Sequence, residues 1–267
     1  MDVPAETLAG ALNGDPRAAA SLVRALERPF YNLALRMLMC PSDAEEATQE
    51  ALLRVLTHLS EFRGESRFST WAYRVAVHRI LDEKRARGRR HEMTFDEHAA
   101  DLANGLRADA EERAEDAVLL TQVKLGCGRA LLQCLDADHR LAYVLGEILE
   151  LSSDEAALVA DVPAPTFRKR LSRARQRIGD ALRERCGIVN EASPCRCHRR
   201  LDRAKALGRV DAAALIEPLD LVKVRRAVQE VEALQRAAAY FRADPEAPAP
   251  ADYVARLRAL VASSSLS

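Results

Sequence analysis

The side chains best suited to site chemistry lie late in the chain, at Cys186, Cys195, Cys197 and His198. Thiolate and imidazole groups are the ligands that Zn²⁺ prefers, and four of them complete a tetrahedral site. Cys195 and Cys197 are close enough in sequence to bind one ion. However, the spacing is not that of paired CxxC motifs, and His198 follows Cys197 directly, which is sterically awkward. Three interpretations stay open: a zinc site, redox-responsive thiols, and a turn with idle cysteines.

The remaining cysteines, Cys40, Cys127 and Cys134, are interpreted as small core residues. Cys127 and Cys134 are seven residues apart on a predicted helix. They therefore share a face but are too far apart to bond directly. In a chain that we expect to stay inside the cell, six cysteines indicate thiols or metal ligands and not a disulfide framework.

Contact with nucleic acid is a second chemistry, indicated by the basic segment 166–177. Guanidinium, ammonium and hydroxyl groups reach phosphates and base edges. The candidate side chains are Thr166, Arg168, Lys169, Arg170, Ser172, Arg173 and Arg175. By charge alone, a solvated basic helix explains the segment equally well.

The segment 62–90 mixes aromatic and cationic side chains around Trp71, the only tryptophan. This combination suits unstacked single-stranded bases. The alternative is that Phe68 and Trp71 are core residues beside a solvated basic tail, and these residues alone favour that alternative.

Helices must position all of these groups, because the aromatic content is only 4% and the core must rest on Leu, Val and Ala. Helical spacing of Leu22, Leu26, Phe30, Leu33 and Met37 predicts a helix from Pro16 through Cys40. The next predicted helix covers 43–58, with Ser42 and Glu45 as a capping box. A third extends from a cap at Ser69 or Thr70 to about Arg87.

The acidic stretch 91–116 has little apolar periodicity and is interpreted as a linker with at most a marginal helix near its end. Helices follow, one to about Leu135 and one over 138–149. The segments 151–161 and 163–185 have helix-turn-helix proportions. Ser152 or Ser153 caps the first of these helices, and Asp161 adopts the left-handed conformation in the turn.

Beyond residue 185 the pattern predicts a helical region at 219–240, a proline linker at Pro245, Pro248 and Pro250, and a final helix over 252–261. No long apolar run predicts a membrane span, and the N-terminus lacks a signal-peptide pattern, so we expect a cytoplasmic protein. No phosphate loop, Ser-His-Asp pattern or carboxylate pair indicates an enzyme.

The order and separation of two blocks resemble the extracytoplasmic-function (ECF) sigma factors of bacterial RNA polymerase. The first block is DAEEATQEALLRV at 43–55, FRGESRFSTWAYRVA at 62–76 and LDEKR at 81–85. The second block is LSSDEAA at 151–157 and VPAPTFRKRLSRAR at 162–175. Departures from the family at Glu150, Asp161 and 165–169 leave the motif intact and put the −35 sequence in doubt.

The resemblance implies an all-α protein with sigma region two at 1–91, a flexible acidic linker at 92–116, region four at 117–185 and a helical, Cys-containing extension at 186–267. It implies that the helix 43–58 docks on the clamp coiled coil of the polymerase largest subunit. The residues for that contact are Asp43, Glu46, Gln49 and Glu50, which the resemblance places on the exposed side of the helix, together with Arg54.

The same resemblance implies that region two opens and reads the −10 element, with a flipped base captured by the loop before Trp71. Its DNA-facing residues are Arg63, Ser66, Phe68, Ser69, Thr70, Trp71, Arg74, His78 and Arg85. Region four enters the −35 major groove with the seven side chains of segment 166–177 named above.

The sequence thus predicts a non-enzymatic initiation factor whose partners are core RNA polymerase and promoter DNA, with room for an anti-sigma factor. No cofactor is required, and zinc in the extension stays open. Two alternatives remain: a helix-turn-helix regulator that never binds polymerase, and a metal- or thiol-sensing regulator that acts through the extension.

Overall fold

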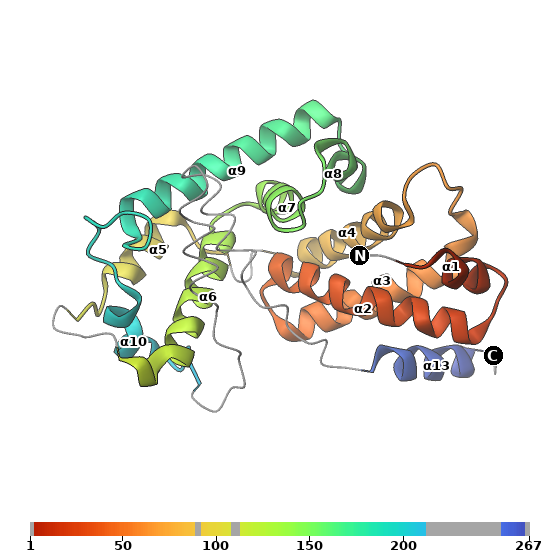
Figure 1. The fold of residues 1–267 in the computed structure, drawn as a ribbon, viewed down its shortest axis with the longest axis horizontal. Helices are drawn as coiled ribbons and strands as arrows, with labels where there is room; N and C mark the ends of the chain where they lie inside the picture. The colour runs from red at the N-terminus through yellow and green to blue at the C-terminus, as the bar shows by residue number, and fades with distance from the viewer. Residues whose placement is uncertain (1–2, 89–91, 108–112, 212–251, 265–267) are drawn as a thin grey trace. The chain divides into compact units, whose positions relative to one another are not determined.

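The computed structural model describes residues 3–88, 92–107, 113–211 and 252–264, and every regular element in these ranges is helical (Figure 1). The chain divides into two compact units. The first comprises Met1–His91, Leu151–Phe167 and Glu246–Ser267, and the second comprises Glu92–Glu150 and Arg168–Pro245. The all-α prediction is confirmed. The predicted helix at 219–240 and the prolines at 245, 248 and 250 lie outside the described residues.

The first unit is built on three packed helices. These are α2 (Pro16–Leu38), α3 (Pro41–Thr57) and α4 (Phe68–Arg87), with α3 in contact with both others. Smaller elements complete the unit: α1 (Ala5–Leu12), η1 (Leu59–Glu61), α8 (Ser153–Ala160) and α13 (Tyr253–Ser264). The five apolar residues that predicted α2 are fully buried, so this amphipathic pattern located the core correctly.

Two predicted helix starts are wrong. Helix α3 begins at Pro41 with Cys40 as N-cap, and no side chain caps it, so Ser42 and Glu45 form no capping box. Proline suits the first helical position because its φ is preset and its missing N–H would be unpaired there. Helix α4 begins at Phe68 without a side-chain cap, which places Ser69 and Thr70 inside its first turn.

The predicted final helix is present as α13, which lies against α2 and α3 of the first unit (Figure 1). Tyr253 and Leu257 are buried, and Arg256 lies 3.8 Å from Glu45 of α3. The end of the chain therefore contributes apolar packing to the same unit as the N-terminal helices.

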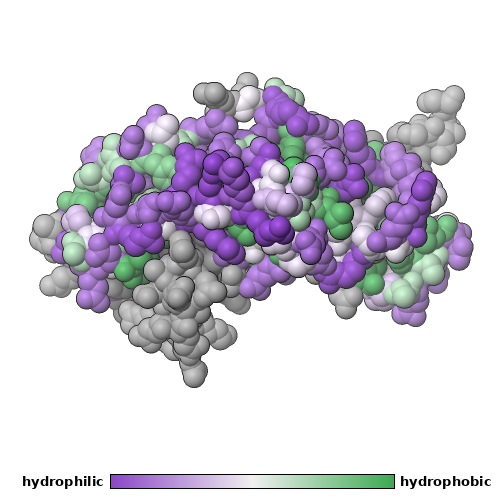
Figure 2. Space-filling model, turned by 90° about the horizontal axis from the view of Figure 1, so that it is seen from above, coloured by the Kyte–Doolittle hydropathy of each residue, from purple (hydrophilic) through white to green (hydrophobic). Residues whose placement is uncertain are grey.

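The second unit contains α5 (Phe95–Ala103), η2 (Ala114–Asp116), α6 (Ala117–Gln133), α7 (Ala137–Tyr143), the π-helical turn η3 (Val144–Ile148) and α10 (Cys197–Ala206). Helix α9 (Ala164–Arg185) begins in the first unit and continues through the second. In the described ranges, no helix is long and apolar enough to cross a bilayer. On the face drawn in Figure 2, hydrophilic side chains predominate and apolar ones form small separate patches.

The interpretation of 91–116 as a linker missed a helix. Thr94 accepts a hydrogen bond from the backbone N–H of Glu97 at 3.1 Å, and the Glu97 carboxylate accepts one from the N–H of Thr94 at 2.7 Å. This capping box starts α5, which contacts α6. The helix is specified by its cap and by packing, and not by an apolar stripe of its own.

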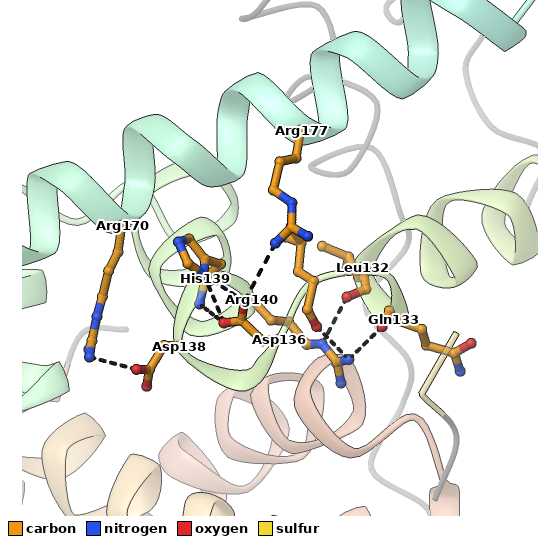
Figure 3. A network of polar contacts seen from close by, with 9 residues as sticks. Leu132, Gln133, Asp136, Asp138, His139, Arg140, Arg170 and Arg177 are labelled. Atoms are coloured by element: carbon orange, nitrogen blue, oxygen red, sulfur yellow. Dashed lines mark hydrogen bonds and ion pairs between the residues drawn. The ribbon is translucent and has the colours of Figure 1, made fainter. Parts of the chain in front are cut away.

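Arg140 joins the end of α6 to α7 (Figure 3). Its side chain is buried, and the residue is 1% exposed. It donates hydrogen bonds to the carbonyl oxygens of Leu132 at 2.8 Å, Gln133 at 3.0 Å and Leu135 at 3.0 Å. The last carbonyls of a helix have no hydrogen-bond donor within the helix and carry partial negative charge. A buried guanidinium supplies the donors and also compensates the charge.

Replacing Arg140 with methionine is expected to lower the free energy of unfolding by roughly 3 kcal/mol, because buried carbonyls lose their donors. Urea unfolding followed by circular dichroism measures the change. Arg168→Met, at an exposed position on α9, is the matched control and should change stability little. Equal stability of the two variants would contradict the assigned role of Arg140.

Candidate nucleic-acid interface

The local signals of the helix-turn-helix are present as predicted. Ser152 caps α8: its hydroxyl accepts from the N–H of Glu155, and the Glu155 carboxylate accepts from the N–H of Ser152, both at 3.3 Å. Asp161 ends α8 in the left-handed conformation with φ of 53°. The N–H of Val162 then donates to the carbonyl of Ala157 at 3.1 Å, and α9 begins at Ala164. Cap, turn and basic helix are therefore confirmed as elements.

Three arginines of α9 are engaged by acids of the second unit. Arg170 lies 2.6 Å from Asp138 and Arg177 lies 3.5 Å from Asp136 (Figure 3). Arg175 forms an ion pair with Glu147, whose side chain is only 4% exposed. A buried carboxylate needs a charged partner, so Arg175 stabilises the fold by pairing with Glu147, independently of any contact with DNA.

The other side chains predicted for −35 DNA project from α9 into solvent. All of them are exposed and end in a polar or cationic group. They are Thr166, Arg168, Lys169, Ser172 and Arg173. The opposite face of the helix buries Leu171, Ala174 and Ile178. The structure therefore divides the seven predicted residues into five that face solvent and two, Arg170 and Arg175, that pair with acids.

The aromatic residues predicted for −10 DNA form one cluster in the first unit. The ring centroids of Phe62 and Phe68 lie 5.4 Å apart, and Trp71 lies 5.7 Å from both. Phe68 and Trp71 are only partly buried, and the nearby Thr70 is 5% exposed. Arg63 is exposed, and Ser66 and Ser69 are half-buried. The cluster thus stabilises the loop before α4 and still presents aromatic edges.

Cationic residues of α4 and of the loop before it meet acids of α8 within the first unit. Arg74 lies 3.1 Å and His78 3.8 Å from Asp161, and Arg67 pairs with Glu155. Arg85, also predicted to contact DNA, pairs with Asp82 of its own helix at 2.5 Å. The cations are evident in the sequence, but the partners of Arg67 and Arg74 are not, because Glu155 and Asp161 lie 88 and 87 residues further along the chain.

The residues predicted to bind polymerase do not share one face of α3. Asp43 is 8% exposed, which corrects its expected place on the exposed side. It is one and two helical turns from the fully buried Ala47 and Ala51, so it belongs to their face. Glu46 and Arg54 are exposed, while Gln49 and Glu50 are half-buried and Glu50 pairs with Arg79 of α4.

The cysteine-containing segment follows α9. Cys186 comes directly after the helix, Cys195 precedes α10, and Cys197 and His198 are its first residues. Among the described residues, no three or more His, Cys, Asp or Glu side chains are already arranged to hold a metal ion. The core assignment of the other cysteines holds for Cys134, which is buried. Cys40 and Cys127 are half-buried as whole residues.

Comparisons with known proteins agree with this geometry. The family described as "Sigma-70 region 2" matches residues 22–90. The chain is 33% identical over 173 residues to the RNA polymerase sigma-H factor of Pseudomonas aeruginosa, covering 63% of this chain and 88% of that protein. It is 30% identical over 176 residues to the ECF RNA polymerase sigma factor SigW of Bacillus subtilis, covering 64% and 92%.

Among solved structures, CnrH in complex with the cytosolic domain of CnrY aligns with a TM-score of 0.46 and 23% identity, covering 66% of this chain and 94% of that one. This similarity adds nothing to the assignment, which rests on the sequence relatives. The chain belongs to the ECF sigma factors of bacterial RNA polymerase.

The division of α9 into paired and exposed cations predicts unequal effects on stability. Arg175→Ala should lower the free energy of unfolding by about 2–4 kcal/mol, because it removes the guanidinium that pairs with the buried Glu147 carboxylate. Arg173→Ala, two residues away and exposed, should change it by less than about 0.5 kcal/mol. Thermal unfolding of both variants measures the difference, and a Tm for Arg175→Ala at the wild-type value would refute the structural role.

Proposed function

We propose that this chain binds core RNA polymerase and directs it to a restricted set of promoters, with α9 reading the −35 element and α4 with its preceding loop reading and melting the −10 element. The observation that carries the proposal is the combination of a sigma region two at residues 22–90 with a capped α8, a left-handed turn and a basic α9 in one chain. As a member of its family, the chain is an initiation factor and not an enzyme.

The exposed face of α9 supports contact with the −35 element. A major groove admits one α-helix, and arginine at its edge binds guanine through two hydrogen bonds. Thr166, Arg168 and Lys169 project from the first turns of α9, and Ser172 and Arg173 follow about one turn later. Arg170 and Arg175 would then mainly hold α9 against Asp138 and Glu147, and contribute less to contacts with bases.

The loop and helix around Trp71 support contact with unpaired bases of the −10 element. Stacking on aromatic rings tolerates any base and gains strength from neighbouring cations. In this structure Arg74 and His78 face Asp161, so DNA must displace that carboxylate before it reaches them. The acids of α8 thus compete with DNA for part of the predicted −10 surface.

Glu46, Gln49, Glu50 and Arg54 are the residues of α3 that support docking on polymerase, because all four retain exposure. Asp43 is a weaker candidate, since its side chain is buried. Because RNA polymerase works in the cytoplasm, the proposed function places the chain there. An anti-sigma factor remains a proposed partner without a docking surface assigned to it.

Run-off transcription with core polymerase on genomic fragments tests the function. Wild-type protein should yield promoter-specific transcripts. The double variant Arg168→Ala/Arg173→Ala should bind promoter DNA at least roughly tenfold more weakly, and the slope of log affinity against log salt should fall by about 2. Arg183→Ala, near the end of the same helix, is the control. Specific DNA binding without any polymerase-dependent transcript would favour the stand-alone regulator instead.

Association with polymerase can be tested apart from DNA. Glu46→Lys should weaken binding to core enzyme roughly tenfold or more, because a docking surface loses its charge complementarity. Glu6→Lys, an exposed charge reversal on α1, is the matched control. Biolayer interferometry with immobilised core enzyme measures both, and equal affinities would remove Glu46 from the interface.

A further inference from the structure

Four cysteines of the second unit gather in one region although they come from distant segments. Cys127 lies on α6, Cys186 follows α9, and Cys195 and Cys197 stand at the start of α10. The Cys127 thiol lies within electrostatic range of the other three. The backbone N–H of Gly187 donates to the carbonyl of Cys195 at 3.0 Å, which brings the chain at Cys186 beside Cys195.

The segment that holds three of these cysteines is folded by its own hydrogen bonds. Asn190 donates from its side chain to the carbonyl of Arg183 at 2.7 Å, and Ser193 to that of Arg185 at 2.5 Å. Arg196 donates to the carbonyls of Ser193 at 2.5 Å and Glu191 at 2.7 Å. The cysteines after α9 therefore stand on an ordered loop that turns back on the end of the helix.

Glycine is required where this loop closes. A Cβ at position 187 would lie 2.2 Å from the carbonyl oxygen of Cys195, a distance that no side chain permits. Glycine at position 187 thus lets the backbone after Cys186 approach the backbone at Cys195. Such an approach brings these two cysteines to the same place, where both can bind one metal ion.

The first turn of α10 is pinned to α5 by Arg200, which is buried. Its guanidinium donates to the carbonyls of Asp101 at 2.6 Å and Asn104 at 2.5 Å and to the Asp101 carboxylate at 3.0 Å. Helix α10 also contacts α6. Cys197 is three residues before Arg200, so this anchor holds it close to the helix that bears Cys127.

His98 of α5 borders the cluster. Its Nε2 lies 3.8 Å from the Sγ of Cys127, and its Nδ1 is buried without a hydrogen-bond partner. An imidazole N–H beside a sulfur can donate a hydrogen bond to that sulfur once it is ionised.

Cationic side chains already lie near the cluster, since Arg200 is within electrostatic range of both Cys127 and Cys195. Four thiolates in one place still repel one another. A divalent cation relieves this repulsion, because it binds thiolates directly and neutralises their charge.

We propose that Cys127, Cys186, Cys195 and Cys197 bind one Zn²⁺ as four thiolates and release their four protons to solvent, tying α6 and α10 to the end of α9. Cys127 replaces His198 in the ligand set expected from sequence, and His98 supports the site from α5. Among the described residues no three such side chains are already arranged around one metal position, so the proposal requires the four thiols to move together when the ion binds. The proposal is independent of promoter recognition.

Metal analysis of the full-length protein tests the site. Wild-type protein should bind one Zn²⁺ per chain, and Co²⁺ in its place should give the intense thiolate-to-cobalt absorption of an all-sulfur site. Cys127→Ser should weaken Co²⁺ binding at least tenfold and reduce this absorption, whereas His198→Ala should leave both unchanged. His98→Ala should weaken binding roughly 10–100-fold and leave the stoichiometry at one.

Cys40→Ser and Cys134→Ser are the matched controls and should bind as wild type does. Thiol alkylation read by mass spectrometry uses unmutated protein, so it does not depend on whether a variant folds: Zn²⁺ should protect Cys127, Cys186, Cys195 and Cys197 together. Absence of bound metal, wild-type Co²⁺ binding by Cys127→Ser, or protection that excludes Cys127 would each overturn the proposal.

Discussion

The pairing of α9 with carboxylates at the start of α7 and in η3 is the interaction on which the placement of this basic helix depends. Glu147 is almost fully buried, so it needs the guanidinium of Arg175, and Arg170 and Arg177 extend the contact to Asp138 and Asp136. These three arginines keep part of their side chains in solvent, and Arg168, Lys169 and Arg173 project into solvent on the same helix. Pairing with acids thus distinguishes the arginines that hold α9 in place from the cations that we propose contact DNA.

Acids oppose bases in the first unit as well, where Asp161 faces Arg74 and His78. These groups are well exposed, so each pair contributes little to stability and can be exchanged for phosphate at small cost. The chain has equal numbers of acidic and basic residues, 40 of each. These contacts show that some of the acids lie directly opposite the cations that they balance. A neutral protein with internally paired cations suits a factor that should bind promoters only together with polymerase.

The described residues that follow α9 belong to both units. Helix α13 buries Tyr253 and Leu257 in the first unit, and α10 is anchored to α5 by Arg200 in the second. Local signals predicted much of the fold: helical spacing located the core of α2, and Ser152 with Asp161 located the two ends of α8. The burial of Asp43 was not predicted, because it depends on packing against other helices. The starts of α5 and α3 were missed although both are encoded locally, in the Thr94–Glu97 capping box and in Pro41.

By itself, the sequence determined most of the described helices, the helix-turn-helix signals and the sigma family, because these are encoded in cap chemistry, 3.6-residue periodicity and short motifs. Only the tertiary structure decided which arginines of α9 are paired and which cysteines lie together. Both depend on contacts between distant segments, such as Arg175 with Glu147, 28 residues apart. From spacing along the chain, His198 was the expected fourth ligand, because it directly follows Cys197. Packing instead brings Cys127 toward the other three cysteines, and contacts between helices cannot be read from sequence spacing.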